Sequence, residues 1–381
     1  MKASILPVGK NLENTIINFL KDALDKKCFD AVIIPKRVPS EDSFAYLLIK
    51  DKSILEDSSP LSPVIPVQGA KAISNLTRLG KVKNKILAVM HPCEIRATIE
   101  LYKLKQACLG NIFFLSFDCS GIMNLSEYLI DPAGSDQAYQ ASYLNWNNEK
   151  KRPVCQICTE FVPFASDLHI GLLGADEGKI FLIPISSEGE EIMNSLGLKI
   201  DDSVEKWEEG VKKLKKEREE KREKAHKALK TEVEGPDKFL AAISKCINCH
   251  NCMRVCPICY CRQCYFESDA FKYLPDNYIK RAEKKGSLRL PAETLLFHLG
   301  RMSHMVFSCV SCGTCEDACP MDIPIAQIFS LAADKTQKLF DYVAGRSKDE
   351  PLPNVSYQEE ELEEVEKPYT ETYVKTEEKI V

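Results

Sequence analysis

Short apolar runs alternate with helical patterns through the first 200 residues of the chain. The apolar runs, each bounded by polar or turn-forming residues, are 31–34, 86–90, 112–115, 168–174 and 180–185. Apolar residues recur at helical spacing in three stretches, 14–24, 70–79 and 94–105. Apolar runs separated by amphipathic helices predict the strands of a buried, mainly parallel sheet. We therefore expect residues 1–200 to form an α/β domain.

A charge-dense segment follows this region. Residues 205–230 mix acidic and basic side chains at the spacing of neighbours on a helix. Such mixing is typical of a solvated helix and not of a basic binding arm. We expect residues 201–234 to form a charged helical connector that marks a domain boundary.

The remaining chain divides into a helical region and an acidic tail. Residues 294–306 and 324–339 carry helical apolar spacing within a cysteine-rich stretch, so an all-α domain is expected over 235–342. Residues 347–381 hold eleven acidic residues against four lysines and few core-forming residues. Such a segment buries too little apolar surface to fold alone. We expect 343–381 to be an acidic tail that is disordered or bound to a partner.

Composition narrows the class of protein. The chain has 381 residues, of which 44% are hydrophobic and 28% charged, as in ordinary soluble proteins. Its formal charge of −5 provides no electrostatic footprint for nucleic acid. No apolar run approaches the roughly 18 residues that a membrane helix requires. The first residues also lack the apolar segment of a signal peptide. We therefore expect a cytoplasmic protein without a membrane span.

Cysteine is the unusual component, with 17 residues. Disulfide-rich frameworks serve mainly small secreted domains, whereas these cysteines cluster at metal-ligand spacing. Two copies of the pattern C-x2-C-x2-C-x3-C-P have the spacing of bacterial ferredoxins. They comprise Cys246, Cys249, Cys252 and Cys256 before Pro257, and Cys309, Cys312, Cys315 and Cys319 before Pro320. We expect these cysteines to be thiolate ligands.

The ferredoxin pattern assigns the ligands to two cubane 4Fe-4S clusters. In this arrangement the first three cysteines of a motif bind one cluster and the fourth binds the other cluster. The first predicted set is Cys246, Cys249, Cys252 and Cys319. The second predicted set is Cys309, Cys312, Cys315 and Cys256. Structural zinc is the alternative, but four zinc ligands would not explain a third cysteine, a fourth cysteine and a proline in both copies.

The two motifs begin 309 − 246 = 63 residues apart, with helical patterning between them. This arrangement resembles the helical ferredoxin domains of heterodisulfide reductase and succinate dehydrogenase iron-sulfur subunits. The first motif also continues into Cys259, Cys261 and Cys264. These three thiols could hold a fourth cluster with a further ligand such as Cys28 or Cys108. They could equally be buried free cysteines, or ligands in a different partition.

Four more cysteines lie in the α/β half. Cys93 and Cys119 each follow a predicted strand, and Cys155 and Cys158 form a C-x2-C pair. The carboxyl ends of parallel strands form the ligand crevice of an open sheet, so Cys93 and Cys119 are expected to face the same crevice. The alternative for these two is structural burial, since free cysteine packs as a small hydrophobe.

This succession of strand, Pro-Cys, strand, Cys and C-x2-C resembles the beta subunits of coenzyme F420-reducing hydrogenase and F420-linked formate dehydrogenase. The resemblance implies that Cys93, Cys119, Cys155 and Cys158 hold a third 4Fe-4S cluster beside FAD. It also implies that the flavin exchanges a hydride with the deazaflavin coenzyme.

A flavin site has less support from the residues themselves, because no G-x-G-x-x-G follows a predicted strand. Small or polar residues where backbone could approach a phosphate or ring are Gly121, Asn124, Gly171 and Gly174. Arg96 could pair with a pyrophosphate. Each of these five could instead be an ordinary turn residue or surface arginine.

These observations favour an iron-sulfur electron-transfer subunit of a multi-subunit oxidoreductase, with flavin as a further expected cofactor. Its expected partners are a formate dehydrogenase or hydrogenase-type subunit and a heterodisulfide-reductase-like module. One alternative is a self-contained F420-dependent oxidoreductase that exchanges hydride at bound FAD. Another is a zinc-stabilised binding protein.

Overall fold

The computed structural model describes residues 2–146, 150–163, 165–269, 274–287 and 293–356. The strands are β1 (Lys2–Pro7), β2 (Ala31–Arg37), β3 (Phe44–Ile49), β4 (Ile86–Val89), β5 (Ile112–Phe117), β6 (Leu168–Gly171), β7 (Lys179–Pro184) and β8 (Asp202–Ser203). The helices of the first half are α1 (Leu12–Asp25), α2 (Gly69–Leu76), α3 (Pro92–Lys103), α4 (Leu125–Tyr128), α5 (Pro132–Ser142), α6 (Pro153–Gln156) and α7 (Ser187–Ser195). Those of the second half are α8 (Glu205–Val233), α9 (Pro236–Ala242), α10 (Asn251–Val255), α11 (Pro275–Lys285), α12 (Thr294–Met305), α13 (Thr314–Asp317) and α14 (Ile325–Leu339). Two 3-10 helices, η1 (Lys52–Asp57) and η2 (Tyr265–Glu267), complete the elements.

In the described part of the chain, eight strands form one sheet in the order β3-β2-β4-β5-β6-β7-β1-β8. The predicted α/β class is confirmed, but the sheet is mixed and not mainly parallel. Only β2–β4, β4–β5 and β5–β6 pair in parallel, and the other four pairings are antiparallel. The difference arises because β2–β3 and β6–β7 are joined by connections too short to hold a crossover helix, and β1 inserts between β7 and β8.

Helices cover both faces of the sheet. Alternate residues of β2 and β4 face α1 on one side, where Ile16 and Leu20 are buried. The other residues of the same strands face α2 and α3, through Ile73, Ile95 and Ile99. This alternation follows from the two-residue period of a strand, and the apolar stripes of the helices complete both cores.

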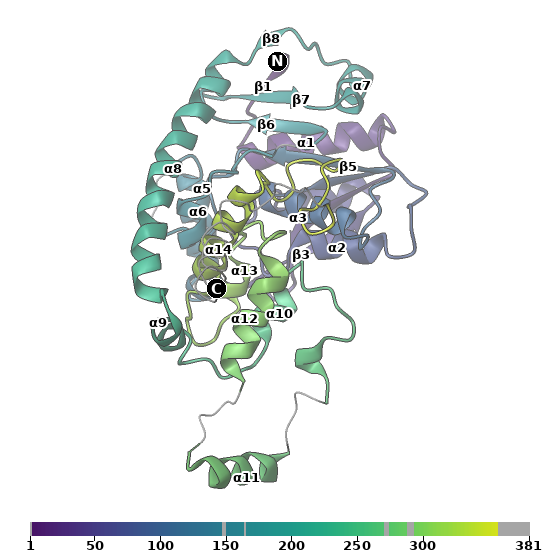
Figure 1. Cartoon of the computed structure of the whole chain (residues 1–381). Helices are drawn as coiled ribbons and strands as arrows, with labels where there is room; N and C mark the ends of the chain where they lie inside the picture. Colours follow the sequence, from purple (N-terminus) through teal and green to yellow (C-terminus); the bar gives the residue numbers. More distant parts are fainter. Residues whose placement is uncertain (1, 147–149, 164, 270–273, 288–292, 357–381) are drawn as a thin grey trace, which may run out of the picture.

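Helix α8 runs along one side of the molecule from the sheet to the C-terminal region (Figure 1). The helix itself is confirmed over the predicted range, but one face is buried through Trp207, Leu214, Arg218 and His226. The remaining faces are solvated, as expected for a sequence rich in Lys and Glu. This helix therefore contributes side chains to the interior as well as joining the two halves.

The C-terminal region is helical and packs against the α/β half. A single hydrophobic cluster joins Ala97 and Leu101 of α3 to Phe297 and Phe329 of α12 and α14. Residues 343–356, the described part of the predicted tail, also pack on α3, where Gly345 N donates to Glu100. Residues 357–381 lie outside the described residues. Among the helices that the structure describes, none is both long and apolar enough to cross a membrane.

Candidate iron-sulfur centres

The two C-x2-C-x2-C loops adopt the same local backbone. In the first loop Asn248 has φ 58° and His250 has φ 61°, and in the second loop Ser311 has φ 57° and Gly313 has φ 82°. These residues occupy equivalent positions two and four residues after the first cysteine. His250 and Gly313 are also the N-caps of α10 and α13, so the third cysteine of each motif lies at the start of a short helix. The left-handed turns curl each loop so that its thiols face one side.

The first cavity is enclosed by four cysteines from both motifs. Its lining includes Cys246, Cys249, Cys252 and Cys319. Phe297 and His298 of α12 cover it, and His298 Nε2 lies 3.3 Å from Cys246 Sγ. The amide of Asn248 points at the same sulfur, with a nitrogen-to-sulfur distance of 3.4 Å. Donors of this kind stabilise negative charge on a ligating sulfur.

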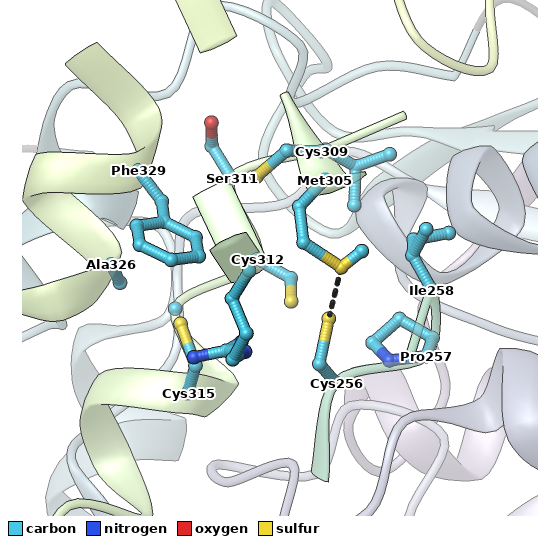
Figure 2. A pocket seen from close by; sticks show the side chains of 13 residues that line it. Cys256, Pro257, Ile258, Met305, Cys309, Ser311, Cys312, Cys315, Ala326 and Phe329 are labelled. Carbon is cyan, nitrogen blue, oxygen red and sulfur yellow. Dashed lines mark hydrogen bonds between the residues drawn. The ribbon is translucent and has the colours of Figure 1, made fainter. Parts of the chain in front are cut away.

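The second cavity is enclosed by Cys256, Cys309, Cys312 and Cys315, which Figure 2 shows around one space. Met305 and Phe329 complete its apolar wall. Cys256 Sγ lies 3.9 Å from Met305 Sδ. Each of the two cavities thus takes three cysteines from one motif and the fourth from the other.

The third cavity lies at the junction of the two halves and is lined by Cys93, Cys119, Cys155 and Cys158. Cys93 lies in the first turn of α3, which begins at Pro92 directly after β4. Cys119 follows β5, so the parallel pair β4–β5 brings both thiols to one edge of the sheet. Short helix α6 supplies Cys155. Cys312 also lines this cavity, which makes it common to the second and third cavities.

Gly121 allows the loop after Cys119 to pass close to α6. Its φ of 105° lies in a region that other residues rarely adopt, and a Cβ there would lie 2.9 Å from Cys155 Cβ. Tyr139 donates to its carbonyl oxygen at 2.9 Å. Gly121 therefore allows Cys155 to pack directly against the loop that follows Cys119.

The chemistry of these donor sets fits iron-sulfur clusters. Burial raises the pKa of Cys119 and of Cys309 to about 12 each, and that of Cys252 to about 11. A thiolate in such an environment needs a cation beside it, and iron ions supply that charge. Soft sulfur ligands in sets of four, enclosed by apolar side chains, suit a cubane.

Three buried arginines lie among the cavities, at positions that no sequence pattern indicates as functional. Arg152, Arg218 and Arg301 are each at most 2% exposed. Arg301 Nη1 lies 3.1 Å from Cys252 Sγ, Arg152 Nη1 donates to the carbonyl of Cys312 at 3.2 Å, and Arg218 Nη1 donates to the carbonyl of Cys158 at 3.1 Å. Their sequence contexts carry no signal of burial, because Arg218 lies in the most highly charged segment of the chain.

The comparisons with known proteins agree with this geometry. Residues 242–323 match the family described as "4Fe-4S dicluster domain". The matched residues contain both ferredoxin motifs, and the match favours iron-sulfur clusters over structural zinc.

Two relatives extend the similarity beyond the dicluster domain. The F420-dependent formate dehydrogenase subunit beta of Methanocaldococcus jannaschii is 29% identical, over 85% of this chain and 89% of the relative. The F420-dependent formate dehydrogenase 1 subunit beta of Methanococcus maripaludis is 28% identical, over 87% of this chain and 90% of the relative. The predicted resemblance to such beta subunits is thereby confirmed.

A solved structure was also found. A chain of the F420-reducing NiFe hydrogenase complex from Methanosarcina barkeri is 15% identical and has a TM-score of 0.46. The match covers 60% of this chain and 91% of that chain.

The additional cysteines of the dicluster domain lie in different environments. Cys259 Sγ is 3.3 Å from Met305 Sδ, and Cys264 Sγ is 3.8 Å from Met253 Sδ. Cys261 is exposed. Cys28 packs against the hydrophobic core of the α/β half, whereas Cys259 and Cys264 pack in the C-terminal cluster. The amide of Cys108 donates to Thr77 of the α/β half.

The five positions considered for flavin contact other parts of the chain. Arg96 is buried, and its Nε donates to the carbonyl of Ala344 at 2.8 Å. Gly171 packs on Trp207, and Gly174 packs on the backbone of Lys206 at the start of α8. Asn124 is the N-cap of α4, and Gly121 lies against Cys155. Arg96 lines a groove between α8 and α14 and Gly121 lines the third cavity, so neither of these two cavities of the described residues brings two of the five positions together. The flavin site stays a prediction.

Proposed function

We propose that this chain is the iron-sulfur electron-transfer subunit of a multi-subunit oxidoreductase, and that it holds three 4Fe-4S clusters. The observation that carries the proposal is that three four-cysteine cavities adjoin one another. Cys312 lines both the second and the third cavity. Arg301 contacts Cys252 of the first cavity and lines the second. Clusters in these cavities would form a relay in the order first, second, third.

A bound cubane would supply reversible one-electron chemistry, and the chain supplies its surroundings. The cysteines of each cavity would bind the iron. Phe297, Met305 and Phe329 exclude water from the first and second cavities. Exclusion of water matters because solvent exposure and hydrogen bonds to sulfur set the potential of a cluster.

The proposed partners follow from the relatives. Both are named as beta subunits of formate dehydrogenases, so a catalytic subunit of formate dehydrogenase or hydrogenase type is the proposed partner on one side. The helical dicluster domain would pass electrons to or from a heterodisulfide-reductase-like module on the other side. The direction of flow is set by the relative potentials of donor and acceptor.

Oxygen-free purification followed by iron and sulfide analysis tests the cluster count. Three cubanes correspond to about twelve irons per chain, and two to about eight. C119A should remove the third cluster alone, because Cys119 lines only the third cavity, and leave about eight irons. C261A is the matched control, since this exposed cysteine lines none of the described cavities. A wild-type chain with about eight irons would contradict the third cluster.

A second candidate function, hydride exchange with coenzyme F420 at bound FAD, has one observation in its favour. A long groove between α8 and α14 reaches Cys158 of the third cavity and Cys309 of the second. Arg96 is the only one of the five positions considered for flavin that lines the groove in the described structure. Flavin analysis of the purified complex and an F420 exchange assay decide this question. A complex that transfers electrons without bound flavin would exclude this candidate.

A further inference from the structure

Each junction between neighbouring cavities holds one buried arginine. Arg301, 2% exposed, lies between the first and second cavities. Its Nη1 is 3.1 Å from Cys252 Sγ, its Nη2 donates to the carbonyl of the same residue at 3.2 Å, and its side chain lines the second cavity. Its charge acts on Cys256 and Cys315 of the second cavity as well as on Cys252.

Arg152 occupies the corresponding place between the second and third cavities, with 1% exposure. It is the N-cap of α6, the helix that carries Cys155 of the third cavity, and its Nη1 donates to the carbonyl of Cys312 of the second. Gly313 lets the second ferredoxin loop approach it, since a Cβ there would be 3.1 Å from Arg152 Cδ. Its charge acts on both Cys155 and Cys312.

A buried positive charge has a definite effect on a nearby cluster. Reduction of a cubane adds one negative charge, and an electron that moves between neighbouring cubanes oxidises one and reduces the other without making or breaking a bond. A fixed guanidinium in a medium of low dielectric constant stabilises the reduced form more than the oxidised form. It therefore raises the reduction potential of every cluster that it faces.

Resting on the three-cluster assignment above, we propose that Arg301 and Arg152 are positioning residues that tune the clusters in pairs. Arg301 raises the reduction potentials of the first and second clusters, and Arg152 raises those of the second and third. The second cluster is common to both pairs. Each arginine thereby links the potentials of two neighbours across the junction where an electron passes.

Asp317 provides a test of opposite sign. This residue ends α13, is paired with Arg152 Nη2, and accepts the amide of Leu125 at 2.8 Å. Its carboxylate offsets part of the charge of Arg152 at the same junction. Removing that negative charge should raise the potentials of the second and third clusters.

The experiment is an anaerobic redox titration of the complete chain with dithionite, monitored by electron paramagnetic resonance. C119A, which is expected to lack the third cluster, identifies the signal of that cluster by its loss. R152Q should lower the second and third potentials and leave the first unchanged, whereas R301Q should lower the first and second and leave the third unchanged. D317N should raise the second and third. R152K and R301K keep the positive charge, so their reduction potentials should stay closer to those of the wild-type protein.

R37Q is the matched control, because Arg37 also pairs with an aspartate, Asp136, but lines none of the described cysteine cavities. Its three potentials should match those of the wild-type protein. Equal shifts of all three potentials in R152Q, or no shift in either R152Q or R301Q, would overturn the proposal. If R152Q loses iron, D317N and R152K decide, and an unchanged second and third potential in D317N rejects the role of this junction. Failure of the three-cluster assignment would appear earlier, as an iron deficit in the wild-type chain.

Discussion

The indole Nε1 of Trp207, in the first turn of α8, donates to the buried carboxylate of Asp118, with distances of 3.1 and 3.0 Å to its two oxygens. Asp118 directly precedes Cys119 at the end of β5. Its Oδ2 also accepts the amides of Leu172 and Leu173, at 2.6 and 2.9 Å. One carboxylate therefore joins the third cavity to the end of β6 and to α8.

D118N should lower the stability of the chain by about 3 kcal/mol, because an amide cannot accept all of these donors and leaves buried N–H groups unpaired. W207F removes one donor and should cost less. The measurement is the midpoint of anaerobic thermal unfolding. D176N is the control, since Asp176 is half-exposed and pairs with Lys206 at the surface. An equal loss in D176N and D118N would refute this account.

Arg218 should contribute more than the other basic residues of α8. It donates to three carbonyl oxygens, those of Ser120, Trp146 and Cys158, and its guanidinium carbon lies 4.9 Å from the ring centre of Phe161. R218M leaves these acceptors unpaired and should cost about 3 kcal/mol.

The matched variant is K224M, at an exposed position of the same helix. It should change the free energy of unfolding by no more than about 0.5 kcal/mol and leave the midpoint nearly unchanged. Similar midpoints for R218M and K224M would mean that α8 is a solvated connector after all.

Gly313 should tolerate no side chain. Its φ of 82° is strained for alanine, and a Cβ would lie 2.7 Å from Val154 Cγ2. G178A is the control, because Gly178 has φ 73° with open space around it, and it should cost only the backbone strain of about 1–2 kcal/mol. G313A should cost more and should lower the iron content as well. Equal unfolding midpoints in the two variants would show that the contact with Val154 is relieved.

Glu13 should make the stability depend on pH. Burial raises the pKa of this α1 carboxyl from 4.5 to about 7, so the folded chain binds the proton more tightly than the unfolded chain. The stability that this proton confers is complete below pH 4.5 and is lost as the pH rises through 7.

E13Q should therefore raise the free energy of unfolding at pH 8 by about 1 kcal/mol for this half-buried group. At pH 5 it should leave the free energy of unfolding nearly unchanged. E127Q, at an exposed position of α4, should have no effect at either pH. A larger gain from E13Q at pH 5 than at pH 8 would reverse the sign and reject the assignment.

The spacing of apolar residues predicted most of the long helices and strands, because the buried face of each element appears as a local pattern in the sequence. Helices α1, α3, α8, α12 and α14 and strands β2, β4, β5 and β7 lie where apolar spacing indicates them. Strands β1 and β3 were missed, since both have mixed burial. β3 lies at one edge of the sheet, and β1 lies beside β8, the strand at the other edge. The antiparallel direction of β1 depends on its pairing with β7, which is remote in sequence, and no local pattern carries that information.

The candidate site also combines features set by local sequence patterns with features set by contacts between remote residues. Ferredoxin spacing predicted the two cysteine sets of the C-terminal half because each loop is a local pattern. The shared crevice of Cys93 and Cys119 was predicted from the carboxyl ends of parallel strands, which requires that the two strands be neighbours. No sequence pattern indicates that Arg152, Arg218 and Arg301 are buried. A guanidinium is buried only where the fold places carbonyl oxygens around it. The sequence around Arg301 does not distinguish this buried arginine from a solvent-exposed one.

The position of β1 has a consequence for biosynthesis. Ser4 pairs with Leu182, so β1 is synthesised long before β7 and waits for the chain through β7 before it gains its principal partner. Contacts of such long sequence separation form late and slowly. The thiols at positions 93, 119, 155 and 158 are all synthesised before that closure, so the sheet beside the third cavity is still incomplete when its four cysteines have been made.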